Sequence, residues 1–223
     1  MIKKKNSVVN SFSKEELKFL KQFKKPYDIQ LFLNSVKYNA GSGTHSPRFV
    51  IDKQKAHCFE GALFAASALR TMGYKPLIVD MMAHNDDDHV IAIFKQNNFY
   101  GAVAKSNTTL LRFREPVFHT IRELALSYFE YYFNTIGEKT LRSYSSLVDL
   151  SRFDKDCWMT TESNLDFIAD YLYTVKHHEI ADRRMIRSFS IADKDLMNIC
   201  FTGSVDEGLF KPEPKVKNKK QLR

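Results

Sequence analysis

The chain has 223 residues, of which 43% are hydrophobic and 13% aromatic, which suits one domain of ordinary to large size with its own core. No run of about 18 apolar residues is present, and the N-terminal residues MIKKKNSVVNSFSKEEL contain no apolar segment long enough for a signal peptide, so we expect neither a membrane span nor export. The three cysteines, Cys58, Cys157 and Cys200, are few and odd in number, which argues against a disulfide framework and favours a reducing, cytoplasmic location.

The formal net charge of +8 lies entirely in the two ends of the chain. Residues 1–7 contribute +3 and residues 211–223 contribute +5, so residues 8–210 carry 25 basic and 25 acidic side chains and are neutral. We therefore interpret residues 8–210 as a single domain between a flexible basic N-terminus and a disordered basic tail. Solubilising ends explain this charge better than a nucleic-acid site does, although such tails can add weak phosphate contacts that are independent of base sequence.

Two short helices and a loop are predicted ahead of the central region. Ser13 caps a helix that runs through about Phe23, and a second helix follows Pro26. The second helix is expected to bury four apolar side chains, Ile29, Leu31, Phe32 and Val36. The glycines and the proline of GSGTHSPR, residues 41–48, then predict a loop. We interpret this loop as a connector, with a wall of a site as the alternative for Thr44, His45 and Ser46.

The most informative segment begins with a helix that carries a cysteine at its start. From Cys58, steps of three and four residues reach the apolar positions Ala62, Ala65, Leu69 and Met72, and Gly73 ends the helix. Free N–H groups at a helix N-terminus favour a thiolate over a thiol, whose ordinary pKa is about 8.5. Cys58 is therefore a candidate nucleophile, although a cysteine on an alanine face is more often a plain core residue.

Three strands are predicted after this helix. Residues 76–82 form an apolar run, residues 83–88 an acidic turn, and the β-branched run from His89 to Phe94 a second buried strand. Asn97 and Asn98 turn the chain into a third strand over residues 99–104. If these strands are antiparallel and pack on the helix, His89 comes next to Cys58, where a base that activates a thiol must lie.

This order of elements resembles the core of the transglutaminase-like superfamily, whose members act on acyl groups through a Cys-His-Asp triad. The resemblance rests on HCFEGALFAASALRTMGYKP, LIVDM, DHVIAIF and FYGAVAKSN, covers about residues 55–107, and extends to the related papain-like proteases. It implies an α+β fold in which a central cysteine-bearing helix packs on a small antiparallel sheet, with additional helices. It also implies that Cys58 is the nucleophile and His89 the base, with no cofactor.

The third member of the triad does not carry over. The family's aspartate falls on Ala104 or Lys105, and no carboxylate lies between Asp88 and Glu115. Ser106 and Asn107 are the nearest polar side chains that could accept a hydrogen bond from the second imidazole nitrogen. Of the two we expect Asn107, since an asparagine serves this role in papain-like sites. Two hypotheses follow from this departure. One is a cysteine-dependent hydrolase of amide, peptide or ester bonds, or an acyltransferase to an amine, acting on a peptide, protein or small acyl substrate. The other is a catalytically inactive binding module with the same fold.

A metal site is an alternative interpretation of the acidic turn. Five side chains with ligand atoms lie within six positions, namely His84, Asp86, Asp87, Asp88 and His89. Their spacing matches no two-ligand helix motif, and successive aspartates of a turn point different ways. We therefore expect no metal.

The rest of the chain predicts packing elements. Arg112 and Arg114 share one face of an extended segment, where they would suit an anionic substrate if that face borders the cleft. Helices are predicted over residues 119–134, over residues that follow a Ser163 cap, and over residues 191–201, with a strand or short helix over 141–153. His177 and His178 are placed at a helix end, where the dipole favours cations without a metal.

Overall fold

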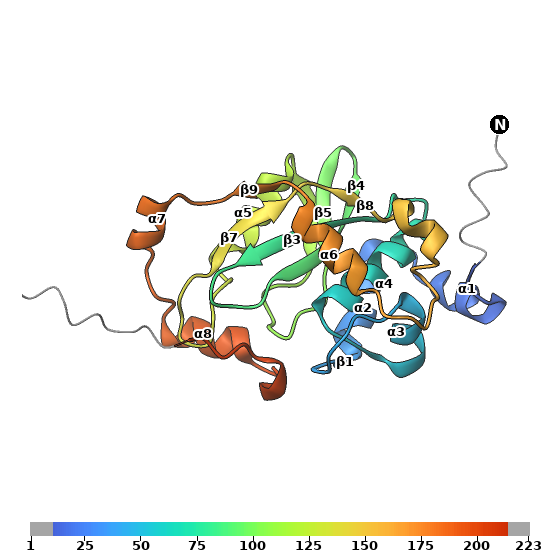
Figure 1. Cartoon of the computed structure of the whole chain (residues 1–223), viewed down its shortest axis with the longest axis horizontal. Helices are drawn as coiled ribbons and strands as arrows, with labels where there is room; N and C mark the ends of the chain where they lie inside the picture. The colour runs from blue at the N-terminus through green and yellow to red at the C-terminus, as the bar shows by residue number, and fades with distance from the viewer. Residues whose placement is uncertain (1–10, 214–223) are drawn as a thin grey trace, which may run out of the picture.

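The computed structural model describes residues 11–213. Its main sheet is antiparallel and has seven strands (Figure 1). Its strand order is β6-β5-β4-β3-β7-β9, and β8 also pairs with β3. The strands are β3 (Leu77–Ala83), β4 (His89–Gln96), β5 (Phe99–Val103), β6 (Arg114–Phe118), β7 (Leu141–Ser145), β8 (Val148–Asp149) and β9 (His177–Glu179). The predicted α+β class, helices with an antiparallel sheet, is therefore confirmed.

Helices cover both faces of this sheet. They are α1 (Lys14–Leu20), α2 (Pro26–Ser35), α3 (Pro47–Lys53), α4 (Cys58–Thr71), α5 (Ile121–Phe129), α6 (Asp166–Thr174), α7 (Arg183–Ser188) and α8 (Lys194–Phe201), with 3₁₀ turns η2 (Leu150–Asp156) and η3 (Asp206–Gly208). A short parallel pair, β1 (Lys37–Tyr38) and β2 (Lys55–Ala56), leads into α4. Of the two predicted flexible ends, residues 1–7 and 211–223, the structure describes only residues 211–213, so the flexibility of the others stays a prediction.

The alternation of side chains along β4 divides the core into two layers. Val90, Ala92 and Phe94 pack with α4 and the other N-terminal helices, whereas Ile91 and Ile93 pack with α5 on the opposite face. Successive strand side chains point to opposite faces, so both faces of a strand this apolar have to be covered. Figure 1 shows the result, with α2, α3, α4 and α6 gathered on one side of the sheet.

The cysteine helix and the strands after it form where they are predicted. α4 begins at Cys58, and the chain leaves it through Gly73, whose φ of +95° requires glycine. The β4–β5 hairpin turns through Asn97 and Asn98, with φ of +51° and +70°, the left-handed conformation that a two-residue turn needs. Because the pairing of β3, β4 and β5 is antiparallel, the start of β4 lies beside the end of β3, close to the N-terminus of α4.

Several predicted elements differ in the structure. Residues from Pro47 form helix α3 instead of continuing a loop, because proline suits the first position of a helix. α5 ends at Phe129, five residues before the predicted end, and Leu165, not Ser163, precedes α6. Leu31 on α2 is 50% exposed instead of buried. His177 and His178 belong to strand β9, which pairs with β7.

Candidate functional site

The start of α4 is held by a capping arrangement around the cysteine. His57 precedes the helix, and its Nδ1 accepts a hydrogen bond from the N–H of Phe59 at 3.2 Å. The Glu60 carboxylate accepts one from the N–H of His57 at 2.9 Å. These two bonds satisfy N–H groups that lack partners inside the helix. Cys58 therefore projects from a helical turn whose backbone is fixed.

Glu60 also ties the preceding loop to the helix. Its carboxylate is fully buried and accepts hydrogen bonds from the Nδ2 of Asn39 at 2.9 Å and from the Nδ1 and N–H of His45. The His45 ring stacks on Phe49 with ring centres 4.0 Å apart. Of the loop residues, His45 braces α4, whereas the Thr44 N–H donates to the Asp166 carboxylate of α6 at 3.1 Å. Thr44, His45 and Ser46 are not among the residues that line the Cys58 cavity.

The Cys58 sulfur lies against the backbone on either side of His89. Its thiol donates to the carbonyl of Asp88 at 3.7 Å, and the backbone N–H of Val90 is the strongest group that favours a thiolate. Burial outweighs this N–H, and the charges of Asp87 and Asp80 add to the effect of burial, so that the pKa of Cys58 is raised to about 12. At neutral pH, Cys58 is therefore a protonated thiol.

The His89 ring is fixed through one nitrogen. Its Nε2 lies 2.8 Å from the carbonyl of Leu111, and because a carbonyl can only accept, Nε2 carries the proton and Nδ1 keeps a free lone pair. The ring packs edge-on against Tyr128 and Tyr132, with centroids 6.4 Å away in each case. Burial, together with the charge of Arg114, lowers the pKa of His89 to about 4. His89 is a neutral base at neutral pH.

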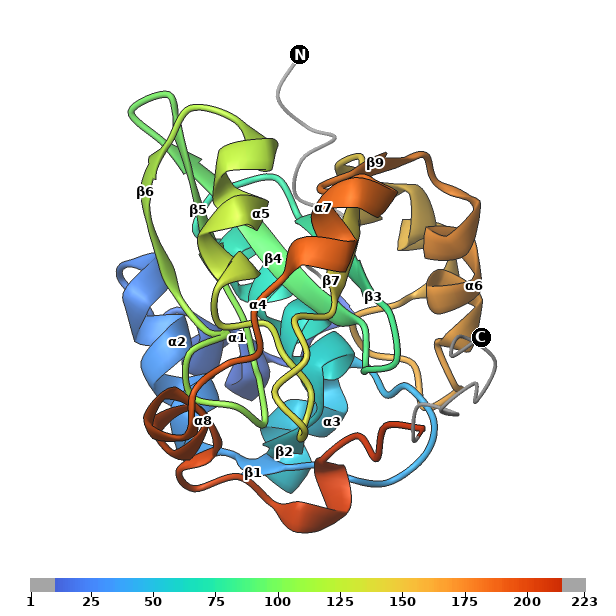
Figure 2. The same cartoon turned by 90° about the vertical axis from the view of Figure 1, so that its left-hand side faces the viewer.

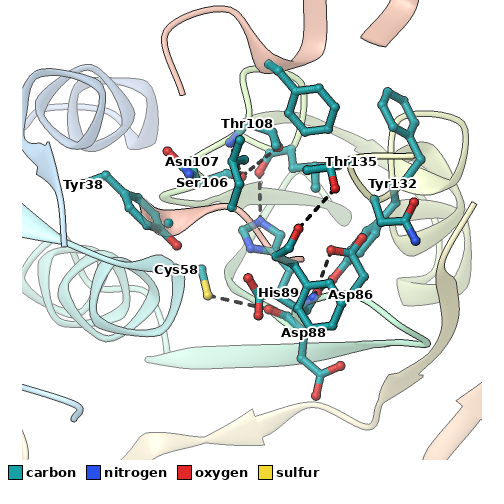
Figure 3. A pocket seen from close by; sticks show the side chains of 18 residues that line it. Tyr38, Cys58, Asp86, Asp88, His89, Ser106, Asn107, Thr108, Tyr132 and Thr135 are labelled. Atoms are coloured by element: carbon teal, nitrogen blue, oxygen red, sulfur yellow. Dashed lines mark hydrogen bonds between the residues drawn. The ribbon is translucent and has the colours of Figure 1, made fainter. Parts of the chain in front are cut away.

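Cys58 and His89 line one cavity of about 60 Å³ (Figure 3), room for a few water molecules. No hydrogen bond joins the sulfur to the imidazole among the described residues. His89 shares its side of β4 with Ile91 and Ile93, whereas α4 packs on the other side, and the cavity is lined from both sides. Further lining residues include Tyr38, Ser106, Thr108, Tyr132, Thr135 and Phe201.

Asn107 lies in the cavity wall but does not orient His89. Its Nδ2 donates to the carbonyl of Val205 at 2.9 Å, and its Oδ1 accepts from the N–H of Val205 at 2.9 Å. The hydrogen bond from the imidazole that was predicted for the Asn107 side chain is made to the backbone carbonyl of Leu111 instead. Both hydrogen-bonding ends of the Asn107 amide are therefore used on the C-terminal segment.

Lys105 is one of the two residues, with Ala104, on which the resemblance places the family's aspartate, and its side chain is used elsewhere in the fold. Its ammonium donates to the carbonyls of Leu33 and Val36, at 2.9 and 2.6 Å, at the C-terminal end of α2. Burial lowers its pKa to about 8, and the nearby Arg112 adds to this. Arg114, one of the two arginines that would suit an anionic substrate if their face bordered the cleft, instead stacks on an aromatic ring, with its guanidinium 3.8 Å from the Tyr128 ring centre.

The acidic turn between β3 and β4 forms another wall. Asp86 accepts from the Thr140 hydroxyl at 2.7 Å, Asp88 accepts from the N–H of Ala83 at 2.7 Å, and the carbonyl of Asp87 accepts from the Tyr132 hydroxyl at 2.7 Å. Burial raises the pKa of all three carboxyls, that of Asp86 to about 6. Among the described residues, no group of three or more His, Cys, Asp or Glu side chains is arranged to hold a metal ion.

Replacing Asp86 with asparagine is expected to stabilise the protein above pH 6. The folded state holds a proton on Asp86 up to about pH 6, whereas the unfolded chain releases it near the ordinary value of 3.8, so the stability that Asp86 contributes falls as the pH rises through this window. A neutral amide removes that loss, which amounts to about 2–3 kcal/mol. Urea unfolding of both proteins at pH 7.5 and 4.5 measures the gain, which should be clearly smaller at pH 4.5. An equal gain at both pH values would contradict the raised pKa.

A second histidine site was missed in the sequence. The His177 Nε2 lies 3.2 Å from the Asp80 carboxylate, which is nearly fully buried, and the His177 Nδ1 lies 2.8 Å from the carbonyl of Val175. Burial and the charge of Asp88 raise the pKa of Asp80 to about 6, although His177 opposes them. An aspartate inside the apolar run LIVDMM was the available signal. The pairing of β9 with β7 brings the histidine to it.

No protein-family model matches the chain, and no curated protein sequence matches it. No helix among residues 11–213 has the length and apolar character that crossing a membrane requires.

Proposed function

We propose that this chain is a cysteine-dependent acyl-handling enzyme of the transglutaminase-like, papain-like kind. One observation carries the proposal: Cys58, at the N-terminus of a buried helix, and His89, with its Nδ1 free to accept a proton, line the same cavity. A nucleophile with a base beside it is the arrangement that covalent acyl transfer requires. The antiparallel sheet with the cysteine helix packed on it supports the same resemblance.

The protonation states define the order of events. Because the thiol and the imidazole are both neutral at pH 7, the Cys58 proton moves to the His89 Nδ1 as the sulfur attacks the carbonyl carbon of the substrate. The resulting imidazolium protonates the leaving amine or alcohol, and a thioester on Cys58 remains. Water then attacks the thioester with Nδ1 as base, which releases the acid and the thiol. Hydrolysis is the reaction proposed, since no residue of the site selects an amine as acceptor.

Backbone N–H groups at the start of α4 would stabilise the negative charge that develops on the substrate oxygen. The N–H of Cys58 lies in the first helical turn, where no intrahelical acceptor exists for it. An oxyanion at this position would also meet the positive end of the helix dipole.

A second candidate is a binding module that keeps the fold without the chemistry. Two observations favour it: the thiol donates to Asp88 instead of the imidazole, and the pKa values of about 12 and 4 oppose a thiolate–imidazolium pair. In this case the cavity would hold a ligand and Cys58 would be inert.

Acylation by p-nitrophenyl acetate distinguishes the two candidates. Without a base, a thiol with a pKa of about 12 reacts more slowly than the exposed Cys157, because the thiolate is the attacking species. An enzyme reverses that order. Peptide mapping by mass spectrometry at pH 7.5 should find acetyl-Cys58 first and should show it turning over. Acetylation at Cys157 alone would favour the binding module.

A further inference from the structure

The C-terminal segment, residues 204–213, lies across the candidate site, and we call it the C-terminal strap. Its residues Gly208, Leu209 and Phe210 line the Cys58–His89 cavity. The same three residues line a second, open hollow of about 400 Å³ on which Cys58 and His57 also border. The strap thus forms a wall shared by the thiol cavity and the open hollow. Figure 2 shows the segment after α8 crossing the lower end of the molecule beside β1.

The strap is held largely through its backbone, with one side-chain hydrogen bond from the Ser204 hydroxyl to the carbonyl of Asn107 at 3.0 Å. Asn107 pairs with both the N–H and the carbonyl of Val205, at 2.9 Å each. The Thr135 hydroxyl donates to the carbonyl of Phe210 at 3.2 Å, and Asn85 pairs with the N–H and carbonyl of Glu213 at 2.9 and 3.4 Å. The side chains of Asn107, Thr135 and Asn85 therefore bind backbone N–H and carbonyl groups of the strap, and not its side chains. A site built this way accepts a peptide segment.

At Gly208, the space around the strap limits which residue fits. A Cβ built on Gly208 would lie 2.3 and 2.7 Å from two ring carbons of Tyr38 and 3.0 Å from the Asn107 Nδ2. Gly208 is not among the glycines with positive φ, so its backbone suits any residue and the glycine is required by space alone. Tyr38 lines both hollows beside Cys58. The wall next to the thiol therefore admits glycine and rejects a larger residue.

We propose that the site binds peptide segments in which a glycine is followed by large apolar residues, and that the strap, with its sequence Gly208-Leu209-Phe210, occupies the site in cis as a competitor of such peptides. The acyl chemistry on a bound peptide rests on the function proposed above, but the peptide binding does not. The strap thereby limits access to Cys58 until a peptide displaces it.

Labelling of Cys58 in the full-length chain tests the strap. Gly208→Ala should raise the rate of iodoacetamide labelling at Cys58 about tenfold or more, which corresponds to about 1.4 kcal/mol of strain between the added Cβ and Tyr38. The exposed Cys157 in the same molecule normalises the reagent, and the buried Cys200 should stay unlabelled if the fold is intact. Asp206→Ala, an exposed position on the same strap, is the matched control and should leave the Cys58 rate unchanged.

A synthetic peptide tests recognition in trans. The peptide SVDEGLFKPE, the sequence of residues 204–213, should restore protection of Cys58 when it is added to the full-length Gly208→Ala protein. The same peptide with alanine in place of glycine should not protect. If Gly208→Ala fails to fold, Asn107→Ala is the second variant expected to release the strap, since it removes both hydrogen bonds with Val205.

The outcomes separate the two proposals. An unchanged Cys58 labelling rate in Gly208→Ala and Asn107→Ala, or equal protection by the glycine and alanine peptides, overturns the peptide site. Labelling and protection need no turnover, so a chain without acyl activity can still support the peptide site. An active chain whose Cys58 labelling rate is unchanged in both variants overturns the peptide site and leaves the acyl function standing.

Discussion

Replacing His89 with glutamine is expected to slow the acylation of Cys58 by about 10²- to 10⁴-fold, the usual contribution of a positioned general base. The glutamine amide can still donate to the carbonyl of Leu111, which His89 contacts at 2.8 Å, but it has no basic nitrogen where Nδ1 lies. The substitution therefore removes the base and keeps the buried hydrogen bond. The measurement is the rate of acetyl transfer to Cys58 at pH 7.5, with Cys157 as internal reference.

The same substitution separates a catalytic from a packing role. The rate at Cys157 should not change, and the unfolding midpoint in urea should stay close to that of the wild type because the Leu111 contact is retained. His89→Ala serves as a comparison variant. It leaves the Leu111 carbonyl without its partner, so it is expected to lower the free energy of unfolding as well. An unchanged Cys58 rate in a folded His89→Gln protein would remove His89 from the mechanism.

The pH profile of the wild-type rate reports how His89 works. A base must be unprotonated, and because burial lowers the pKa of His89 to about 4, the rate should rise through about pH 4 and then stay level through neutrality. An acid limb near pH 6.5, the ordinary value for histidine, would mean that the imidazole is solvated in the reacting state. Such a shift is expected in Gly208→Ala if release of the strap opens the cavity to water.

The central elements could be predicted because their signals are local. The apolar steps from Cys58 to Met72 and the glycine after them determine α4, and the Asn97-Asn98 pair determines the hairpin that follows β4. The predicted loop over residues 41–48 is wrong at its end because proline is compatible with two local structures. Pro47 can end a loop or begin a helix, and the structure uses it at the first position of α3.

The cavity depends on contacts between distant residues that no spacing encodes. Asn107 bonds to Val205, 98 positions later in the chain, and His177 pairs with Asp80, 97 positions earlier. The Leu111 carbonyl that fixes His89 is a backbone atom, so no side-chain motif could have indicated it. Sequence reasoning named Cys58 and His89 from their places on a helix and a strand. The third contact of the site requires the folded chain.

Gly61→Ala is expected to lower the free energy of unfolding by about 3 kcal/mol, although alanine is the better helix former. A Cβ on Gly61 would lie 2.2 Å from the Cβ and 3.4 Å from the Cα of Lys105, and neither atom can move as a flexible side-chain tip can. Helix propensity alone predicts the opposite sign, a gain of about 0.5–1 kcal/mol. The sign of the change in urea unfolding therefore decides between close packing and propensity.

A double-mutant cycle with Lys105→Gly assigns the effect to this contact. Lys105→Gly removes the Cβ that clashes, so Gly61→Ala should cost clearly less in that background, with a coupling energy above about 1 kcal/mol. Gly61 lies three residues after Cys58 on α4, so a helix pushed away from Lys105 also moves the thiol relative to His89. Gly61→Ala should accordingly slow Cys58 acylation. A stabilising Gly61→Ala would mean that α4 does not approach Lys105 this closely, and the shared cavity of Cys58 and His89 would then lose its structural basis.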